Sequence, residues 1–353
     1  MKKYLMAAVV AAMMLSLALP VVAQGLQNVE LHGYMQNRFY ANPKDSARFI
    51  SFRTSLSAVA QLGKDGTGYA EIYYHPNSAG SAVYMESAYV DLPLAEGRIR
   101  IGKGRQLSFG MVPAYGNRKT TLYGSVSELF TADRIQGFQY AYKKDTFNVG
   151  VSLFTDLRLN VRGLGGFPGG GATVVNHFAE RDLQGASSGN LAGSVKVGVN
   201  TPCLQAHASA SVGKLVPADA NLIAGQYGVV TTNTDHNKYG VDANYASGPF
   251  IGQVQWYQGN YSFLKITGYS ALVGYQPKDE RRFYIRYTAL NNNQPANVNQ
   301  LTWDTQQLTV GIVQPIRKGV WAELEYQKNW ESTGGGAPQV NNDLLFLEFF
   351  TGF

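Results

Sequence analysis

The sequence contains one cysteine, and beyond its first residues it has no long apolar run. Cys203 has no second cysteine to pair with, so an internal disulfide bond is excluded. After residue 23 no stretch of 18 or more apolar residues occurs, which excludes a transmembrane helix in that part of the chain. A membrane protein is still possible, because a closed β-barrel also satisfies its backbone hydrogen bonds within a bilayer.

Charged residues are scarce, at 15% of the chain, and the lysines and arginines are spread singly. Nucleic-acid binding, which relies on clustered basic residues, is therefore not expected. The histidines show no spacing typical of metal ligands: they are His32, His75, His177, His207 and His236. The glycine-rich segment 163–171 lacks the Lys-Ser/Thr of a phosphate-binding loop, and no G-x-S-x-G nucleophile motif is present. We predict that the protein is not an enzyme and needs no cofactor.

The first 23 residues have the features of a cleaved secretory signal. Lys2 and Lys3 precede the apolar run "YLMAAVVAAMMLSLAL", and Pro20 is followed by "VVA", which has the small residues that a signal peptidase requires. An uncleaved membrane anchor is the alternative, but the run is short for a span. We expect cleavage after Ala23 and a single mature domain, 24–353. Loss of the two lysines leaves 28 basic and 24 acidic residues, a formal charge of +4.

Apolar and polar residues alternate through most of the remaining chain. In "RFYIRYTA", for example, Phe283 and Ile285 fall on one face, and Arg282 and Arg286 fall on the other. This period of two is typical of half-buried strands, and no helical period competes over a comparable length. It predicts sixteen strands, near 29–40, 48–61, 68–76, 82–92, 98–106, 134–142, 146–154, 191–199, 203–213, 237–246, 250–259, 268–276, 282–290, 305–314, 320–328 and 342–353. Only in 82–92 is neither face clearly apolar.

The connections between the predicted strands differ systematically in length. Every even-numbered strand is followed by a short turn, such as "LGKDGT" or "PIRKG". Most odd-numbered strands are followed by longer loops, notably 107–133, 155–190, 214–236, 291–304 and 329–341. Short turns at one end and long loops at the other are typical of outer-membrane barrels, and closure removes the exposed edges of such a large sheet. We predict an all-β fold, a transmembrane antiparallel β-barrel of about 16 strands with short periplasmic turns and long extracellular loops.

The chain ends on the apolar stretch "NNDLLFLEFFTGF". Leu345, Leu347, Phe349 and Phe353 share one face at a spacing of two, which predicts a closing strand that pairs with 29–40 and turns this face to lipid. Outward aromatics are expected near both ends of other strands, as two girdles: Tyr239 and Tyr245, Tyr269 and Tyr275, Phe283 and Tyr287.

With this final strand the sequence resembles Gram-negative outer-membrane porins, whose last strand typically ends in phenylalanine. The segment "AYVDLPLAEGRIRIGKGRQLSFG" (88–110) is similar to the strand–turn–strand before the third loop in several porin families, while the "PEFGG" motif of enteric general porins is missing. The resemblance implies an outer-membrane location, contact with lipid and lipopolysaccharide, and a homotrimer. It also implies that the barrel assembly machinery reads Phe353, and that 107–133 folds inward as a constriction loop.

The inward polar face carries the functional prediction. A sixteen-stranded barrel holds a water channel, and its lining charges set ion preference. The candidate lining and constriction residues are Arg38, Arg53, Arg118, Lys119, Glu128, Asp133, Arg282, Arg286, Glu323 and Glu325. We therefore expect a porin that passes small hydrophilic solutes and ions passively, with a mild anion preference. The alternatives are a substrate-selective anion or carbohydrate channel, and a barrel that serves as a scaffold for a periplasmic partner.

Overall fold

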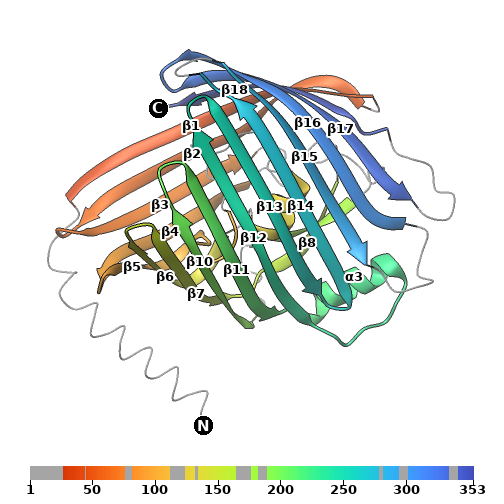
Figure 1. The fold of residues 1–353 in the computed structure, drawn as a ribbon, viewed down its shortest axis with the longest axis horizontal. Helices are drawn as coiled ribbons and strands as arrows, with labels where there is room; N and C mark the ends of the chain where they lie inside the picture. Colours follow the sequence, from red (N-terminus) through yellow and green to blue (C-terminus); the bar gives the residue numbers. More distant parts are fainter. Residues whose placement is uncertain are drawn as a thin grey trace, which may run out of the picture.

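The computed structural model describes residues 27–43, 45–75, 82–111, 124–131, 134–163, 176–181, 189–277, 281–293, 301–333 and 341–353. Sixteen strands form a closed antiparallel barrel (Figure 1). They are β1 (Gln27–Asn42), β2 (Asp45–Leu62), β3 (Gly66–His75), β4 (Ala82–Leu94), β5 (Gly97–Arg105), β6 (Arg134–Lys144), β7 (Phe147–Thr155), β10 (Leu191–Asn200), β11 (Leu204–Lys214), β12 (Asp235–Ser247), β13 (Phe250–Tyr261), β14 (Leu264–Tyr275), β15 (Arg282–Asn293), β16 (Leu301–Arg317), β17 (Val320–Thr333) and β18 (Leu344–Gly352). The predicted fold is confirmed.

Each strand pairs with its neighbours in the chain, except that β7 pairs with β10 across a long connection. The predicted closure is also confirmed, since β18 runs antiparallel to β1 with Arg38 opposite Glu348 and Ala41 opposite Leu345. The connection between β7 and β10 contains a separate hairpin, β8 (Arg158–Gly163) and β9 (Asn176–Arg181). The described residues of other long connections include two helices, α2 (Ser125–Phe130) and α3 (Pro217–Tyr227). Among the described residues, no helix is both long and apolar enough to cross a membrane.

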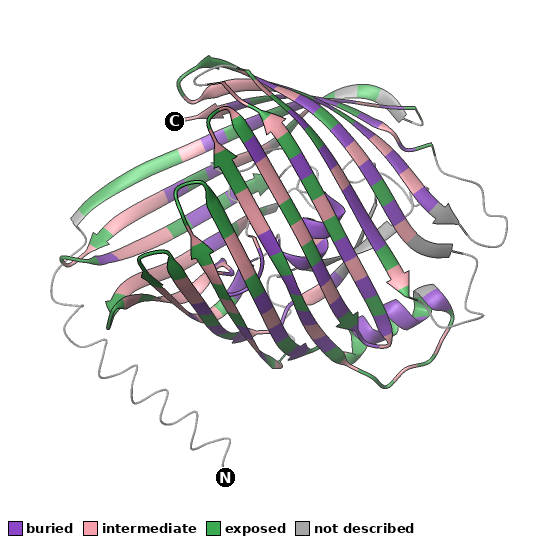
Figure 2. Ribbon diagram, viewed as in Figure 1, coloured by how far each residue is buried: buried purple, intermediate pink, exposed green. Residues whose placement is uncertain are grey.

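Burial alternates along the strands as stripes around the barrel (Figure 2). The outward side chains are apolar and exposed, for example Val241 at 51% and Phe283 at 47%. The inward side chains are mainly polar and buried, which is the reverse of a soluble protein with an apolar core. Of the six predicted outward girdle aromatics, five are exposed and Tyr287 is half-buried. The apolar surface therefore surrounds the barrel, and the polar surface lines it.

Strand β4 explains the one stretch whose alternation the sequence left ambiguous. Glu71 of β3 pairs with Ser87, and the next residue, Ile72, pairs with Met85, so Glu86 is an extra residue in the ladder. Glu86 and Ser87 are both buried, whereas Met85 is exposed. Such a bulge exchanges the inward and outward positions halfway along the strand, which is why neither face is consistently apolar.

Candidate functional site

Residues 106–111, which follow β5, run across the inner face of the barrel wall. The Leu107 amide donates to Gln139 Oε1 of β6 at 2.7 Å, and the Gly110 amide donates to Ser209 Oγ of β11 at 3.1 Å. Between them, the Ser108 hydroxyl bonds to the hydroxyls of Ser152 on β7 and Ser194 on β10. The segment is thus attached to four successive strands of the wall, β6, β7, β10 and β11.

Small inward side chains of the wall strands allow the backbone of residues 106–111 to lie close to the wall. Gly150 of β7 shows the constraint most clearly, because a Cβ there would lie 2.7 Å from the carbonyl oxygen of Leu107. The serines around it combine small volume with a hydroxyl that bonds the crossing segment. A glycine inside a strand marks such a close backbone approach, and here the approach comes from the loop.

Helix α2 lies further along the same connection and packs on the inner face of β13 and β14. Phe130 and Val126 are fully buried and sit four residues apart, on one face of the helix. The Phe130 ring lies 5.6 Å from the ring of Tyr257 and 6.1 Å from that of Tyr261, between ring centroids. A Cβ at Gly268 would come within 3.0 Å of both α2 side chains, so the helix rests directly on the wall. These side chains belong to the largest buried apolar cluster among the described residues, together with side chains of β8 and α3.

The buried carboxylate of Asp242 lies between the attachment of residues 106–111 and the attachment of α2. Asp242 of β12 accepts a hydrogen bond from the Tyr257 hydroxyl at 3.0 Å, and its other oxygen lies 2.9 Å from His207 Nδ1. The same Tyr257 hydroxyl accepts from the Met111 amide at 2.9 Å. Lys196 donates to the Gly110 carbonyl at 3.1 Å, close to this group. Lys196 therefore holds the Gly110 carbonyl directly, and Asp242 acts on the Met111 amide through the Tyr257 hydroxyl.

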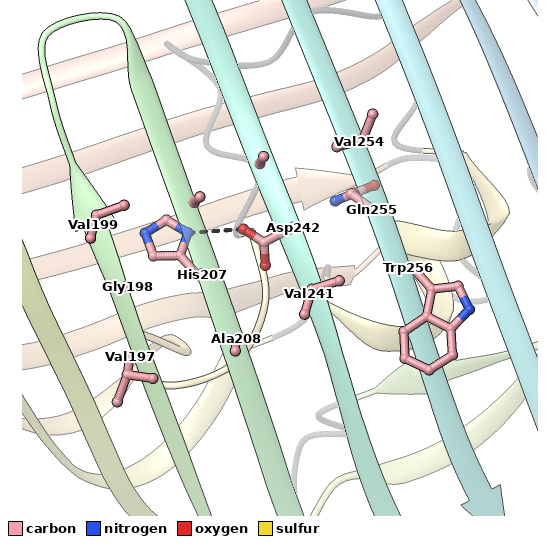
Figure 3. A pocket seen from close by; sticks show the side chains of 12 residues that line it. Val197, Gly198, Val199, His207, Ala208, Val241, Asp242, Val254, Gln255 and Trp256 are labelled. Atoms are coloured by element: carbon pink, nitrogen blue, oxygen red, sulfur yellow. Dashed lines mark hydrogen bonds and ion pairs between the residues drawn. The ribbon is translucent and has the colours of Figure 1, made fainter.

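Figure 3 shows His207 and Asp242 in the wall together with the residues around a hollow of about 510 Å³. Most of the lining belongs to the outward face, including the exposed Val199, Val241, Val254 and Trp256. Small outward side chains on β11, such as Ala206 and Ala208, make the hollow. It therefore opens to the outside of the barrel, and we assign no luminal site to it.

The inward charged residues form two contrasting stretches of wall. Strands β4 to β6 carry the buried pair Arg134–Glu86 and the pair Arg100–Asp91, with Arg100 Nε and Asp91 Oδ1 2.8 Å apart, and Arg38 of β1 forms a buried pair with Glu348 of β18. On β17, Glu323 and Glu325 are buried, and the hydroxyl of Tyr284 on β15 lies 2.7 Å from a carboxylate oxygen of each. The first stretch thus carries arginines paired with acidic residues, whereas β17 carries two neighbouring glutamates.

Arg282 and Arg286 lie on β15, between α2 and the acidic strand. Arg286 is buried and donates to Gln307 Oε1 at 3.1 Å and to Thr309 Oγ1 at 3.0 Å. A Cβ at Gly124, just before α2, would lie 3.2 Å from the Arg286 guanidinium carbon, so the loop passes over this side chain. Arg282 donates to Gln276 Oε1 at 2.8 Å, near the short-turn end.

The hairpin β8–β9 is held inside the barrel by ion pairs that sequence reasoning missed. Arg158 makes a bidentate pair with Asp219 of α3, with both N–O distances 2.8 Å, and the Leu159 amide donates to Asp219 at 3.0 Å. Hydrogen bonding to this carboxylate raises the pKa of Arg158. Buried His236 bonds Asp156 at 2.9 Å, which anchors the start of the hairpin to β12. Leu159 joins the apolar cluster around Phe130.

Comparisons with solved structures give the same architecture. OmpF of Salmonella typhi, in a complex with daunomycin, matches with a TM-score of 0.66 at 13% identity, over 92% of this chain and 97% of its own. OmpT of Vibrio cholerae, an outer membrane protein in trimer form, matches at 0.59 and 14%, over 92% and 99%. An anion-selective porin from Comamonas acidovorans matches at 0.56 and 16%, also over 92% and 99%. The chain has the sixteen-stranded porin fold. No protein-family model and no curated protein sequence matches it.

Within this porin fold, the candidate residues named from sequence fall into three groups. Arg38, Arg53, Arg282, Arg286, Glu323 and Glu325 all lie on inward positions of the wall. Glu128 lies on α2 and is half-buried. Arg118, Lys119 and Asp133 lie outside the described residues. The described parts of 107–133 contact the inner wall at the points given above.

In the part of the chain that the structure describes, no three histidine, cysteine or acidic side chains are grouped as a metal site.

Phe353 is exposed at the end of the closing strand β18. Its backbone exchanges hydrogen bonds of 2.9 and 3.0 Å with Gly33 of β1. The terminal residue thus completes the seam between the first and last strands.

Proposed function

We propose that the protein forms a water-filled channel of the Gram-negative outer membrane through which small hydrophilic solutes and ions diffuse passively. The observation that carries the proposal is a closed sixteen-stranded barrel with an apolar outer surface and a polar inner surface. A barrel of this strand number leaves an aqueous lumen, whereas one of eight strands is filled by its side chains. Along each strand, apolar outward residues alternate with polar inward residues, as they do in strands that span a lipid bilayer.

The loop attachment supports a constriction inside that lumen. Residues 106–111 and α2 lie against the wall, fixed by hydrogen bonds to side chains and by the packing of Phe130. The hairpin β8–β9 lies beside α2 inside the barrel and narrows the lumen further, and solutes would pass through the space that these elements leave. Solutes would be selected by size and by the charges of the facing wall, without a conformational cycle.

We further propose a mild anion preference and a homotrimer. The formal charge of +4 after signal cleavage favours anions, but the pairs Arg38–Glu348 and Arg134–Glu86 neutralise part of the arginine. Glu323 and Glu325 oppose it further. The trimer rests on the porin fold and on the trimer form of the similar OmpT.

A liposome-swelling assay tests the proposal directly. Purified protein should make liposomes permeable to small uncharged solutes, with rates that fall steadily as solute size increases. A control preparation, heat-denatured before reconstitution, should give no swelling. Equal exclusion of all solutes by correctly folded protein would contradict passive diffusion and leave a scaffold barrel as the better interpretation.

A further inference from the structure

A small cavity of about 230 Å³ lies on the inner face of β1, β2 and β3, where side chains from β5 and β6 reach over it. Its lining combines aromatic rings (Tyr69 and Tyr73), a serine hydroxyl (Ser55), a carboxylate (Glu71) and two guanidinium groups (Arg105 and Arg134). The Arg105 carbonyl accepts a hydrogen bond from Gln139 Nε2 at 3.1 Å, and Gln139 also holds the Leu107 amide. The cavity therefore borders the point where the loop 106–111 leaves β5.

The polar groups of the cavity are held in fixed positions. Ser55 Oγ donates to Glu71 Oε1 at 2.8 Å across the β2–β3 ladder. Arg134 pairs with Glu86 and also donates to the Tyr73 hydroxyl at 3.3 Å. The carboxylate and the guanidinium are both planar groups that bond two neighbouring atoms of a ligand at once. These partners hold Glu71 and Arg134 in one orientation before a ligand arrives.

An aromatic surface borders these polar groups. Tyr69 is half-exposed and stacks on Tyr89, with ring centroids 5.0 Å apart and an interplanar angle of 23°. Tyr73 is buried and lies under the Arg53 guanidinium, 4.8 Å from the ring centroid. An aromatic face next to fixed hydrogen-bonding groups fits a ligand with one apolar face and a polar edge.

Groups of both charges face the cavity. Arg105 and Arg134 line it and Arg53 lies over the Tyr73 ring, while Glu71 lines it and Glu86 pairs with Arg134. An anion would gain from the arginines but would meet the Glu71 carboxylate, which projects into the same space. A neutral ligand that both donates and accepts hydrogen bonds meets no such repulsion, because carboxylates only accept and guanidinium groups only donate.

The size and place of the cavity restrict the ligand further. Its volume is below the range of about 300–1,000 Å³ that is usual for drug-sized ligands, so it fits a single ring. In the circuit of sixteen strands, β3 lies eight strands from β13, the strand that carries Tyr257 beneath α2. The cavity therefore lies on the side of the lumen that faces the attached helix.

We propose that this cavity is a luminal binding site for one ring of a neutral polyhydroxylated solute, that is, a monosaccharide unit. Tyr69 would contact the apolar face of the ring, and Glu71, Ser55 and Arg105 would bond its hydroxyl groups. The inference rests on the proposed channel function and adds a preferred class of solute to it. Binding is weak enough for release, since transport requires that the solute leave the site.

The test is a planar-bilayer recording in potassium chloride with D-glucose added stepwise. Glucose should lower the ion current of the parent protein in a saturable way. In Glu71→Gln, which keeps the volume and loses the charge, the half-blocking glucose concentration should rise about tenfold, as expected for loss of a hydrogen bond to a charged group. Tyr69→Ala should weaken the block similarly. Gln253→Ala, on the opposite strand β13, is the matched control and should block like the parent.

Three outcomes separate this inference from the channel itself. Block by inorganic phosphate but not by glucose would overturn the sugar site in favour of an anion site. Equal block in the parent and in both cavity variants would show that glucose acts elsewhere and would also overturn it. If folded parent protein gave no current, the channel proposal would fail. Calorimetric titration of glucose into detergent-solubilised protein would then test glucose binding independently of the channel. Absence of binding in that titration would overturn the inference.

Discussion

Replacement of Phe130 by alanine should release α2 from the barrel wall without disturbing the barrel. Phe130 is fully buried between the helix and the rings of Tyr257 and Tyr261. It belongs to no strand, so the backbone ladder that closes the barrel stays complete. The substitution therefore leaves the barrel intact and perturbs the loop, together with the hairpin residue Leu159 that packs in the same cluster.

The magnitude follows from the burial and the ring contacts. Truncation of a fully buried phenylalanine costs about 3–5 kcal/mol, and we take the lower end because water in the lumen can occupy part of the space. Since about 1.4 kcal/mol corresponds to a factor of ten, the ratio of detached to attached helix should rise on the order of a hundredfold. The remaining contacts of the loop, such as Lys238 Nζ to the Phe130 carbonyl at 3.4 Å, involve the backbone and are retained.

Single-channel recording is the appropriate assay. The parent should give a steady current level, and Phe130→Ala should add frequent excursions to higher conductance as the helix leaves the lumen wall. Phe283→Ala, an outward-facing phenylalanine on β15, is the matched control and should behave as the parent. A Phe130→Ala trace identical to the parent trace, in protein shown to be folded by its heat-dependent gel mobility, would refute the reasoning.

Three further predictions address charge, assembly and the hairpin. Conversion of both Arg282 and Arg286 to glutamate should shift the reversal potential in a salt gradient toward cation selectivity, most strongly at low salt where screening is weak; an unchanged potential would mean that neither residue lines the narrow part. Deletion of Phe353 should lower outer-membrane levels several-fold while refolding into detergent survives, and normal membrane levels would count against an assembly role. Arg158→Ala and Asp219→Ala should each increase proteolytic cleavage within 156–181, and the double variant should add little to either; additive effects would argue against a direct pair.

The barrel could be predicted because the pattern that identifies each strand lies within that strand's own sequence. Each strand alternates between lipid and water, so a period of two appears in every segment, and all sixteen predicted segments correspond to strands of the barrel. The ambiguous segment 82–92 is the informative exception. There Glu86 occupies a bulge opposite Glu71 and Ile72, and a bulge cannot be located from alternation in one strand alone.

The helices α2 and α3 and the hairpin β8–β9 were not predicted as elements, although α3 left a signal in the sequence. In α3, Ala220, Ile223, Ala224 and Tyr227 are buried at helical spacing, Pro217 stands at the first turn and Gly228 ends the helix in a left-handed conformation. Proline at the start and glycine after the end are typical helix boundaries. Helix α2 has only six residues, too few to show a period, and its place depends on Gly268 in a distant strand.

The cavity on β1–β3 could not be predicted for a different reason. Tyr69 and Glu71 share one face of β3, as their spacing of two requires, but Arg105 and Arg134 reach the cavity from β5 and β6. Which inward side chains meet depends on the tilt and stagger of strands around the closed sheet. Alternation predicts whether a residue faces inward or outward. It does not predict which inward side chains of other strands that residue contacts.

The most direct test of the account is the conductance of purified, refolded protein in planar bilayers with several salts. Passive diffusion through a water-filled lumen predicts stepwise current increases whose size grows in proportion to the conductivity of the bulk solution. Permeability to anions should slightly exceed that to cations. Folded protein that inserts into the bilayer and gives no steps, or steps that do not change with salt concentration, would contradict an open aqueous channel.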